Sequence, residues 1–163
     1  MGKVLIIEKD IRTIEVLEML LQALRQPYNV VNTHANVMRI YKNEQVDVIF
    51  MNPEIPLVDP KALIDEMDGA TARLKRSRPP IVFLYTDDGL VRRFNLNIQP
   101  GCQIVRKPVT MEQIYELLDG MGLTKLKITA GNQQVKDKIT RFEDFIEQSE
   151  DWMEKLKGYL LKS

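Results

Sequence analysis

The sequence predicts an α/β domain with a doubly wound, five-stranded parallel sheet, followed by a C-terminal helical extension. Short apolar runs alternate with amphipathic helical patterns up to residue 123. Strand–helix units of this size imply right-handed crossovers and a parallel sheet that is covered on both faces. After residue 123 the alternation stops, and a single long helical pattern begins at Val135.

The expected strands are rich in β-branched and aromatic residues, and their nearly continuous apolar character suits strands buried on both faces. They are Val4–Ile7, Tyr28–Thr33, Val46–Met51, Ile81–Tyr85 and Cys102–Arg106. The expected helices carry apolar residues at spacings of three and four. They cover residues 11–24, residues 36–42, a segment with Leu63, Met67, Ala70 and Leu74, a short polar segment around residues 88–96, and a segment that a capping box of Thr110 and Gln113 begins.

The composition is that of a water-soluble globular protein, with 44% hydrophobic and 28% charged residues. The 23 basic residues balance the 23 acidic ones, so the chain lacks the positive field that non-specific nucleic-acid binding needs. Cys102 is the only cysteine and excludes an intrachain disulfide. No apolar run is long enough for a membrane span. We therefore expect a cytoplasmic protein that binds neither nucleic acid nor membrane.

Polar residues follow the predicted strands where function is expected in a parallel α/β sheet, at the carboxyl ends of the strands. These candidate positions are Glu8, Lys9, Asp10, Asn52, Tyr85, Thr86 and Lys107.

Three segments in the same order resemble the receiver domains of bacterial response regulators, the CheY-like family, across residues 3–123. Residues 3–10 (KVLIIEKD) look like the first strand and acidic cluster of that family. Residues 47–56 (DVIFMNPEIP) look like its third strand, phosphoacceptor position and proline loop. Residues 104–108 (IVRKP) look like its fifth strand and lysine–proline pair. The resemblance implies the flavodoxin-like strand order 2-1-3-4-5 and a cis bond before Pro108.

A working receiver uses two acidic residues to hold Mg²⁺, an aspartate to accept the phosphoryl group, a hydroxyl and a lysine. In this sequence the acidic pair aligns with Glu8 and Lys9, and the phosphoacceptor position is Asn52. An amide nitrogen is not nucleophilic at neutral pH. The hydroxyl position aligns with Tyr85, or with Thr86 if the loop is shifted. Only Lys107 is clearly retained, so the resemblance implies a degenerate pseudo-receiver with no metal, no cofactor and no catalytic residue.

Two lysines near this pocket have alternative roles. The Lys9 ammonium either reaches the place that a metal would occupy, pairing with Glu8 or Asp10, or points into solvent. Lys107 is expected to pair with a neighbouring carboxylate or with the side-chain oxygen of Asn52. The basic stretch Arg73–Arg78 is interpreted as a solvated helix end, because the helix dipole attracts cations there.

Residues 124–134 are expected to be a linker, and residues 135–163 an amphipathic helix with a seven-residue repeat. Its proposed interaction positions are Ile139, Phe142, Ile146, Trp152, Met153, Leu156 and Leu160. This apolar surface either pairs with a second chain to form a dimer, folds back on its own domain, or docks in a groove of a partner protein.

The sequence therefore predicts a phosphorylation-independent signalling adaptor that acts by protein–protein interaction in a bacterial pathway and is not an enzyme. One alternative is an atypical receiver that a small ligand or metal switches in the altered pocket. Another is a phosphoryl-transfer receiver that uses Glu54 or Asp59, although neither residue is expected to face Lys107.

Overall fold

The computed structural model of the chain describes residues 2–56, 58–96 and 99–124. Strands and helices alternate through these residues. The strands are β1 (Lys3–Ile7), β2 (Tyr28–Val31), β3 (Val46–Met51), β4 (Ile81–Tyr85) and β5 (Cys102–Arg106). The helices are α1 (Ile11–Ala23), α2 (His34–Asn43), α3 (Pro60–Leu74), α4 (Asp88–Arg93) and α5 (Met111–Gly120). The expected α/β class is confirmed for these residues, and the expected C-terminal helical extension lies outside them.

The chain divides into two compact units, Met1–Ile114 and Tyr115–Ser163, so α5 begins in the first unit and ends in the second. The first unit contains the whole sheet and α1 to α4. In the described part of the second unit, the Thr124 hydroxyl donates a hydrogen bond to Asp119 at 2.6 Å. The division into a domain, a linker and a helix at residues 123 and 134 remains a prediction.

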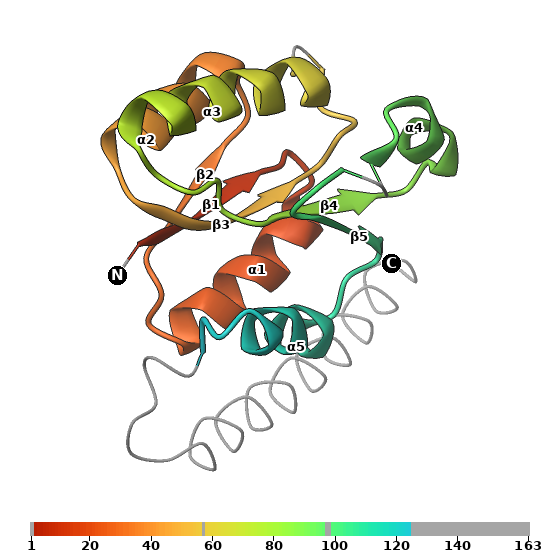
Figure 1. Ribbon diagram of the computed structural model, residues 1–163. Coiled ribbons are helices and arrows are strands. Elements are labelled where there is room, and N and C mark those ends of the chain that lie inside the picture. Colours follow the sequence, from red (N-terminus) through yellow and green to blue (C-terminus); the bar gives the residue numbers. More distant parts are fainter. Residues whose placement is uncertain (1, 57, 97–98, 125–163) are drawn as a thin grey trace, which may run out of the picture. The chain divides into compact units, whose positions relative to one another are not determined.

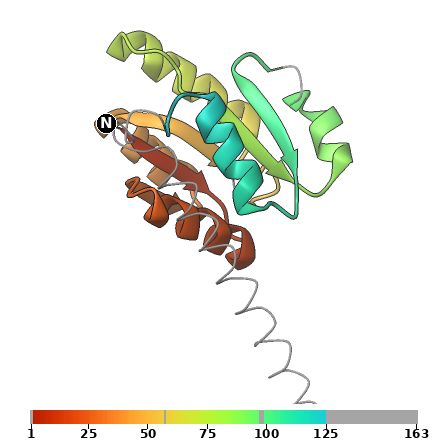
Figure 2. The ribbon, with the colours of Figure 1, turned by 90° about the horizontal axis from the view of Figure 1, so that it is seen from below.

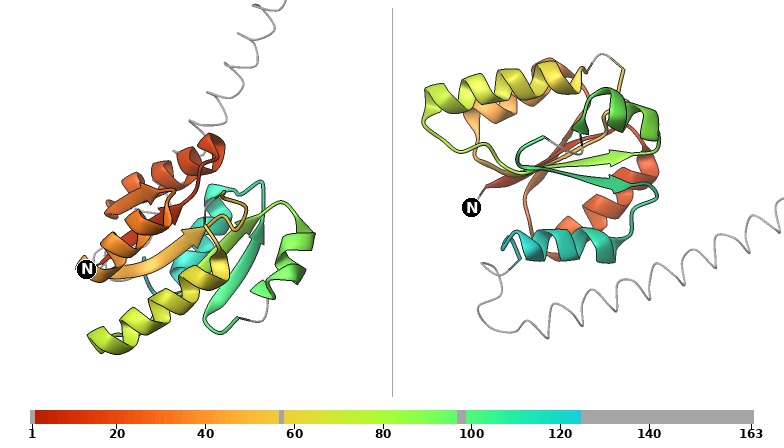
Figure 3. Two further views of the ribbon diagram at one scale, coloured as in Figure 1. Left: turned by 90° about the horizontal axis from the view of Figure 1, so that it is seen from above. Right: turned by 45° about the vertical axis from the view of Figure 1, so that its right-hand side comes forward.

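The sheet is fully parallel, with the strand order β2-β1-β3-β4-β5 that the resemblance implied. In the first unit, α2 and α3 cover one face of this sheet and α1 lies on the opposite face, as Figure 1 and the right-hand view of Figure 3 show. Helix α4 lies beside β4 and β5, away from β1 and β2 (Figure 2). The strand order reverses direction between β1 and β3, which is the point where parallel α/β sheets usually form their sites.

The main core of the first unit lies between the sheet and the helices α2 and α3. Alternate residues of a strand point to opposite faces, so Leu5 and Ile7 of β1 lie on one face with Ile49 and Met51 of β3. These side chains pack with buried apolar residues of α2 and α3, among them Val37, Met38, Tyr41, Leu63, Met67 and Ala70. Both faces of the inner strands are buried, which explains their continuous apolar sequences.

Capping groups define where several helices begin. The Asp59 carboxylate accepts hydrogen bonds from the main-chain N–H groups of Lys61 and Ala62 at the start of α3. Thr110 and Gln113 exchange side chain to main chain hydrogen bonds of 3.1 and 3.2 Å, so the predicted capping box is confirmed. Each such cap satisfies N–H groups that have no partner within their own helix.

One member of the expected apolar stripe of α3 is not part of the core. Leu74 is 40% exposed, whereas Leu63, Met67 and Ala70 are buried. The helix ends at Leu74, and Lys75 has the left-handed backbone conformation that directs the chain away. The stripe was therefore predicted one turn too long.

None of the helices within the described ranges is both long and apolar enough to cross a membrane.

Candidate functional site

The sheet register brings the carboxyl ends of β1 and β3 together. Ile7 pairs with Met51, and the next residues of the two strands are Glu8 and Asn52. The Asn52 N–H donates to the Ile7 carbonyl at 2.8 Å, which extends the ladder by one residue. Because side chains one residue beyond paired positions lie next to each other, Glu8 and Asn52 are neighbours at the topological switch point.

A buried ion pair forms the centre of this site. The Lys107 ammonium lies 2.8 Å from Glu8 Oε2, and the two side chains are 9% and 0% exposed. Oε2 has no hydrogen-bond donor among the described residues, and the Lys107 ammonium neutralises its charge. Lys107 follows β5 and is positioned by its own N–H, which donates to the Tyr85 carbonyl at 2.8 Å. The predicted pairing of Lys107 with a carboxylate is confirmed.

The other carboxylate oxygen of Glu8 receives three N–H donors. The main-chain N–H groups of Lys9 and Asp10 donate to Glu8 Oε1 at 2.9 and 3.0 Å. The Asn52 amide donates to the same oxygen at 2.7 Å. A buried carboxylate needs this many partners, since its charge loses the solvation that water provides. The donors around Glu8 are therefore supplied from within the chain.

Asn52 is 3% exposed, and both ends of its side-chain amide are engaged. Its nitrogen donates to Glu8, and its oxygen Oδ1 accepts the main-chain N–H of Glu54 at 2.8 Å. These two partners also settle which end of the amide is nitrogen, because a carboxylate accepts and an N–H donates. Asn52 Oδ1 is thus bonded to the Glu54 N–H, while Lys107 pairs with the Glu8 carboxylate.

Lys9 and Asp10 lie at the rim of this cluster. The Lys9 side chain is exposed, and the cation that lies beside Glu8 and Asp10 is Lys107. Asp10 Oδ2 accepts the Thr13 hydroxyl at 2.6 Å and lies 3.8 Å from the Lys107 ammonium. The hydrogen bond from Thr13 is the main cause that lowers the pKa of Asp10, with a smaller contribution from the Lys107 charge. The geometry therefore favours the solvent-facing alternative for Lys9.

Glu54 joins the site from the loop between β3 and α3. Its carboxylate accepts the Thr86 hydroxyl at 2.7 and 2.8 Å, and the main-chain N–H groups of Thr86 and Asp87 at 3.1 and 2.8 Å. Partial burial acts to raise the pKa of Glu54. The hydrogen bonds from Thr86 and Asp87, together with the Lys107 charge, outweigh that effect, and the pKa lies below its ordinary value.

From the sequence, neither Glu54 nor Asp59 was expected to face Lys107, and for Glu54 that expectation is wrong. Asp59 is indeed separate, since it caps α3. Glu54, by contrast, contacts Thr86 and is stabilised by the charge of Lys107. Thr86 is the first residue after β4, and its hydroxyl is directed into the site, whereas Tyr85 contributes its main-chain carbonyl. Thr86, and not Tyr85, therefore supplies the hydroxyl at the end of β4.

The Mg²⁺ that a working receiver of this family holds does not fit these donors. Mg²⁺ requires free carboxylate or carbonyl oxygens and several water ligands. Glu8 is saturated by three N–H groups and the Lys107 ammonium, whose positive charge lies where it would repel a second cation. Within the described ranges, no group of three or more His, Cys, Asp or Glu side chains is arranged to hold a metal ion. The site behaves as a closed network of internal charges.

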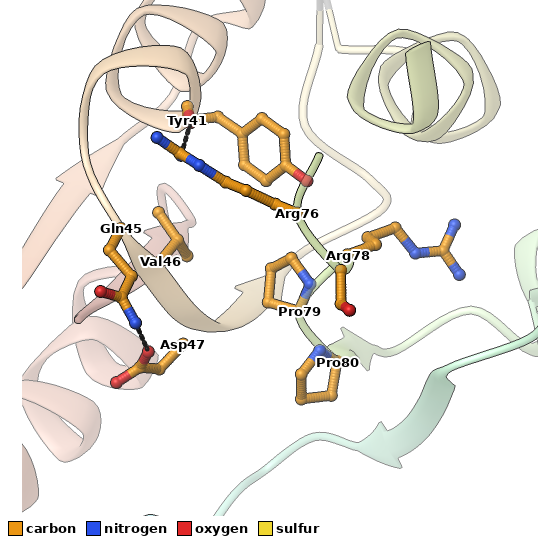
Figure 4. Close-up of a pocket in the computed structure, with 9 residues that line it drawn as sticks. Tyr41, Gln45, Val46, Asp47, Arg76, Arg78, Pro79 and Pro80 are labelled. Atoms are coloured by element: carbon orange, nitrogen blue, oxygen red, sulfur yellow. Dashed lines mark hydrogen bonds between the residues drawn. The ribbon is translucent and has the colours of Figure 1, made fainter. Parts of the chain in front are cut away.

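A hollow of about 580 Å³ lies at the opposite, amino ends of β3 and β4, and the sequence pattern did not predict it. Figure 4 shows its lining, which comes from the end of α2, the start of β3 with the residue before it, and the segment between α3 and β4: Tyr41, Gln45, Val46, Asp47, Arg76, Ser77, Arg78, Pro79 and Pro80. Its arginines already have structural partners. Arg76 donates to the carbonyls of Tyr41 and Glu44 at the end of α2, and Arg78 pairs with Asp68 at 3.0 Å. Two members of the basic stretch, Arg76 and Arg78, thus bind the chain itself.

The peptide bond between Lys107 and Pro108 is cis, as the resemblance implied. The predicted interaction helix with Ile139, Phe142, Ile146, Trp152, Met153, Leu156 and Leu160 lies outside the described residues.

Comparisons with known proteins give a consistent answer at the level of fold. No protein-family model matches the chain, and no curated protein matches it. Among solved structures, the receiver domain of a sensor histidine kinase from Pseudomonas aeruginosa, with a magnesium ion coordinated in its active-site cleft, has a TM-score of 0.60 and 20% identity, over 74% of this chain and 98% of that chain. The chemotaxis response regulator CheY4 of Vibrio cholerae has a TM-score of 0.60 and 16% identity, over 74% and 98%.

A third neighbour is similar over a greater length. A bacteriophytochrome response regulator has a TM-score of 0.59 and 16% identity, over 93% of this chain and 96% of that chain. Identities this low are informative about the fold, which can host many functions. The sheet order and these neighbours together show that the chain has the fold of the CheY-like response-regulator receiver domains.

Proposed function

We propose that this protein is a signalling adaptor that acts by protein–protein interaction and is not phosphorylated. The observation that supports this most directly is the saturated state of the pocket. The residue at the end of β3 is Asn52, whose amide is bonded on both sides, and the adjacent Glu8 carboxylate is neutralised by Lys107. A neutral amide cannot attack a phosphoryl group as a carboxylate does.

The proposed partners are proteins of a bacterial signalling pathway. This part of the proposal rests on the fold, since the solved neighbours include a chemotaxis response regulator and the receiver domain of a sensor histidine kinase. The balance of 23 basic and 23 acidic residues does not favour nucleic acid as a partner. In this proposal the protein is not an enzyme and works in the cytoplasm.

Self-association through the C-terminal helix is the second part of the proposal. Its support is the seven-residue apolar repeat of residues 135–163, which is typical of helices that pair along their length. A dimer formed in this way would give the adaptor two identical partner-binding surfaces, so that it could bring two partner molecules together.

Incubation of the full chain with acetyl phosphate and Mg²⁺, followed by intact-mass measurement, tests the first part. The wild-type protein is expected to show no added phosphoryl mass, and its thermal unfolding should be insensitive to millimolar Mg²⁺. The Asn52→Asp variant serves as the matched comparison, because it restores a carboxylate at the end of β3. A phosphorylated wild-type fraction would refute the adaptor proposal.

Light scattering of the full chain tests the second part. Ile146→Glu places a charge in the apolar repeat, whereas Gln148→Glu places the same charge two residues away, outside the repeat. Only the first change is expected to lower the molar mass from that of a dimer to that of a monomer. A wild-type chain that is monomeric at all concentrations would refute self-association.

A further inference from the structure

One carboxylate binds every donor at the start of the loop between β4 and α4. The main-chain N–H groups of Thr86 and Asp87 lie 3.1 and 2.8 Å from Glu54 Oε1, and the Thr86 hydroxyl bonds to both carboxylate oxygens. Glu54 and Thr86 are separated by 32 positions in the sequence. These bonds therefore connect two loops that only the fold brings together.

Consecutive N–H groups and a hydroxyl that converge on one point form the usual surroundings of a bound anion. Here the anion is part of the chain. Its charge is also favoured by the Lys107 ammonium, which acts on Glu54 as well as on Asp10. The main chain of Glu54 is fixed in turn, because its N–H donates to Asn52 Oδ1 at 2.8 Å. Glu54 is held at its main chain and binds through its side chain.

We propose that Glu54 is an internal anionic ligand of the β4–α4 loop and holds that loop in one conformation without any external anion. This inference deepens the proposed function and rests on it in one respect, since a loop held by its own chain needs no phosphoryl group. The loop leads into α4, whose first turn is further ordered by the Asp87 side chain, which accepts the Gly89 N–H at 2.8 Å.

A consequence for partner binding follows from the position of α4. Arg92 and Arg93 are exposed on this short helix, and the loop that Glu54 binds sets where the helix begins. If the loop has one conformation, these two arginines are presented to a partner in one arrangement. The adaptor would then be permanently ready to bind, and its output would follow its concentration.

Amide hydrogen exchange of the full chain, followed by NMR, tests the proposal. Glu54→Ala removes the carboxylate and is expected to raise exchange at the Thr86 and Asp87 amides by about tenfold, as the loss of a charge-assisted hydrogen bond implies. Glu54→Gln keeps one acceptor oxygen without the charge and should give a smaller increase. Asp59→Ala is the matched control, since it removes the other carboxylate of the β3–α3 loop, which caps α3.

Equal exchange at Thr86 and Asp87 in the wild-type protein and in Glu54→Ala would overturn the proposal. Increased exchange at the β3 amides of Ile49 and Phe50 would reveal general unfolding, and Glu54→Gln then supplies the deciding comparison. Phosphorylation of the wild-type protein is a separate result from loop exchange. It would refute the adaptor proposal, whereas the exchange data alone decide the role of Glu54.

Discussion

The ammonium of Lys107 lies 2.8 Å from the carboxylate of Glu8, and both side chains are almost completely removed from solvent. These residues follow β5 and β1, which are not adjacent in the sheet. Their contact therefore spans the carboxyl ends of β3 and β4. A buried pair of this kind costs solvation of both charges, so its role depends on both partners being present.

Lys107→Ala is expected to destabilise the protein by about 3 kcal/mol, because it leaves the Glu8 charge buried without its counter-ion. Urea unfolding at neutral pH measures this change. Lys42→Ala is a suitable control, since Lys42 forms an exposed ion pair with Glu66 at 3.8 Å, and it should cost less than about 1 kcal/mol. Equal losses in the two variants would show that the pair beside Asn52 has no special role.

Asn52→Asp is expected to lower the free energy of unfolding by about 1 to 3 kcal/mol at neutral pH. The new carboxylate loses the hydrogen bond to Glu8 Oε1 and repels the same oxygen from close range. Millimolar Mg²⁺ should restore part of this loss, because a hard cation can be shared by two carboxylates. Thermal unfolding with and without Mg²⁺ measures the effect. A variant as stable as the wild-type protein would contradict the prediction.

The Glu54 carboxylate is expected to titrate below its ordinary pKa of 4.5, since its hydrogen bonds to Thr86 and Asp87 favour the ionised form. A carboxyl whose pKa is lower in the folded state stabilises the protein at neutral pH. That contribution is lost as the pH falls through the folded-state pKa. The ¹³C chemical shift of the Glu54 carboxyl reports its pKa directly. Urea unfolding at a series of decreasing pH values measures the loss of stability. The Glu54→Gln variant should lose less stability than the wild-type protein over this range, because it lacks the ionisable carboxyl.

Cys102 is expected to react slowly with iodoacetamide at neutral pH, because burial raises the pKa of its thiol above 9.0 and the thiolate is the reactive form. The folded and urea-unfolded proteins can be compared by mass measurement of the alkylated product. The unfolded chain, whose thiol is free of that burial, provides the control and should react faster. Rapid alkylation of the folded protein would contradict the prediction.

The bounds of β3, β4 and β5 could be predicted from the sequence to the residue. The runs of β3 and β4 are largely apolar, and Pro53, Pro80 or Pro108 lies close to one end of each of the three strands. Likewise, the residues at the carboxyl ends of the strands were expected to form one site. A parallel sheet places those ends along the same edge, whatever the loops do.

The pairing within the site could not be predicted in the same way. The contact between Glu54 and Thr86 depends on the path of two loops and on the side-chain conformation of Glu54, and neither follows from local periodicity. The choice between Tyr85 and Thr86 depended on where β4 ends, and a shift of one residue sends a side chain to the other face of the sheet. Local patterns fix the strands, whereas side-chain contacts between distant loops decide which polar groups meet.

The two bonds of the Asn52 amide have a mechanical consequence. Glu8 after β1, Asn52 after β3, Glu54 in the following loop and Thr86 after β4 form one unbroken series of hydrogen bonds. A displacement of the Thr86 loop would pull on Glu54, then on Asn52, and finally on the buried Glu8. The carboxyl ends of β1, β3 and β4 therefore resist distortion together, because this series of hydrogen bonds connects them. A force applied by a protein bound at α4 is shared by these three strands.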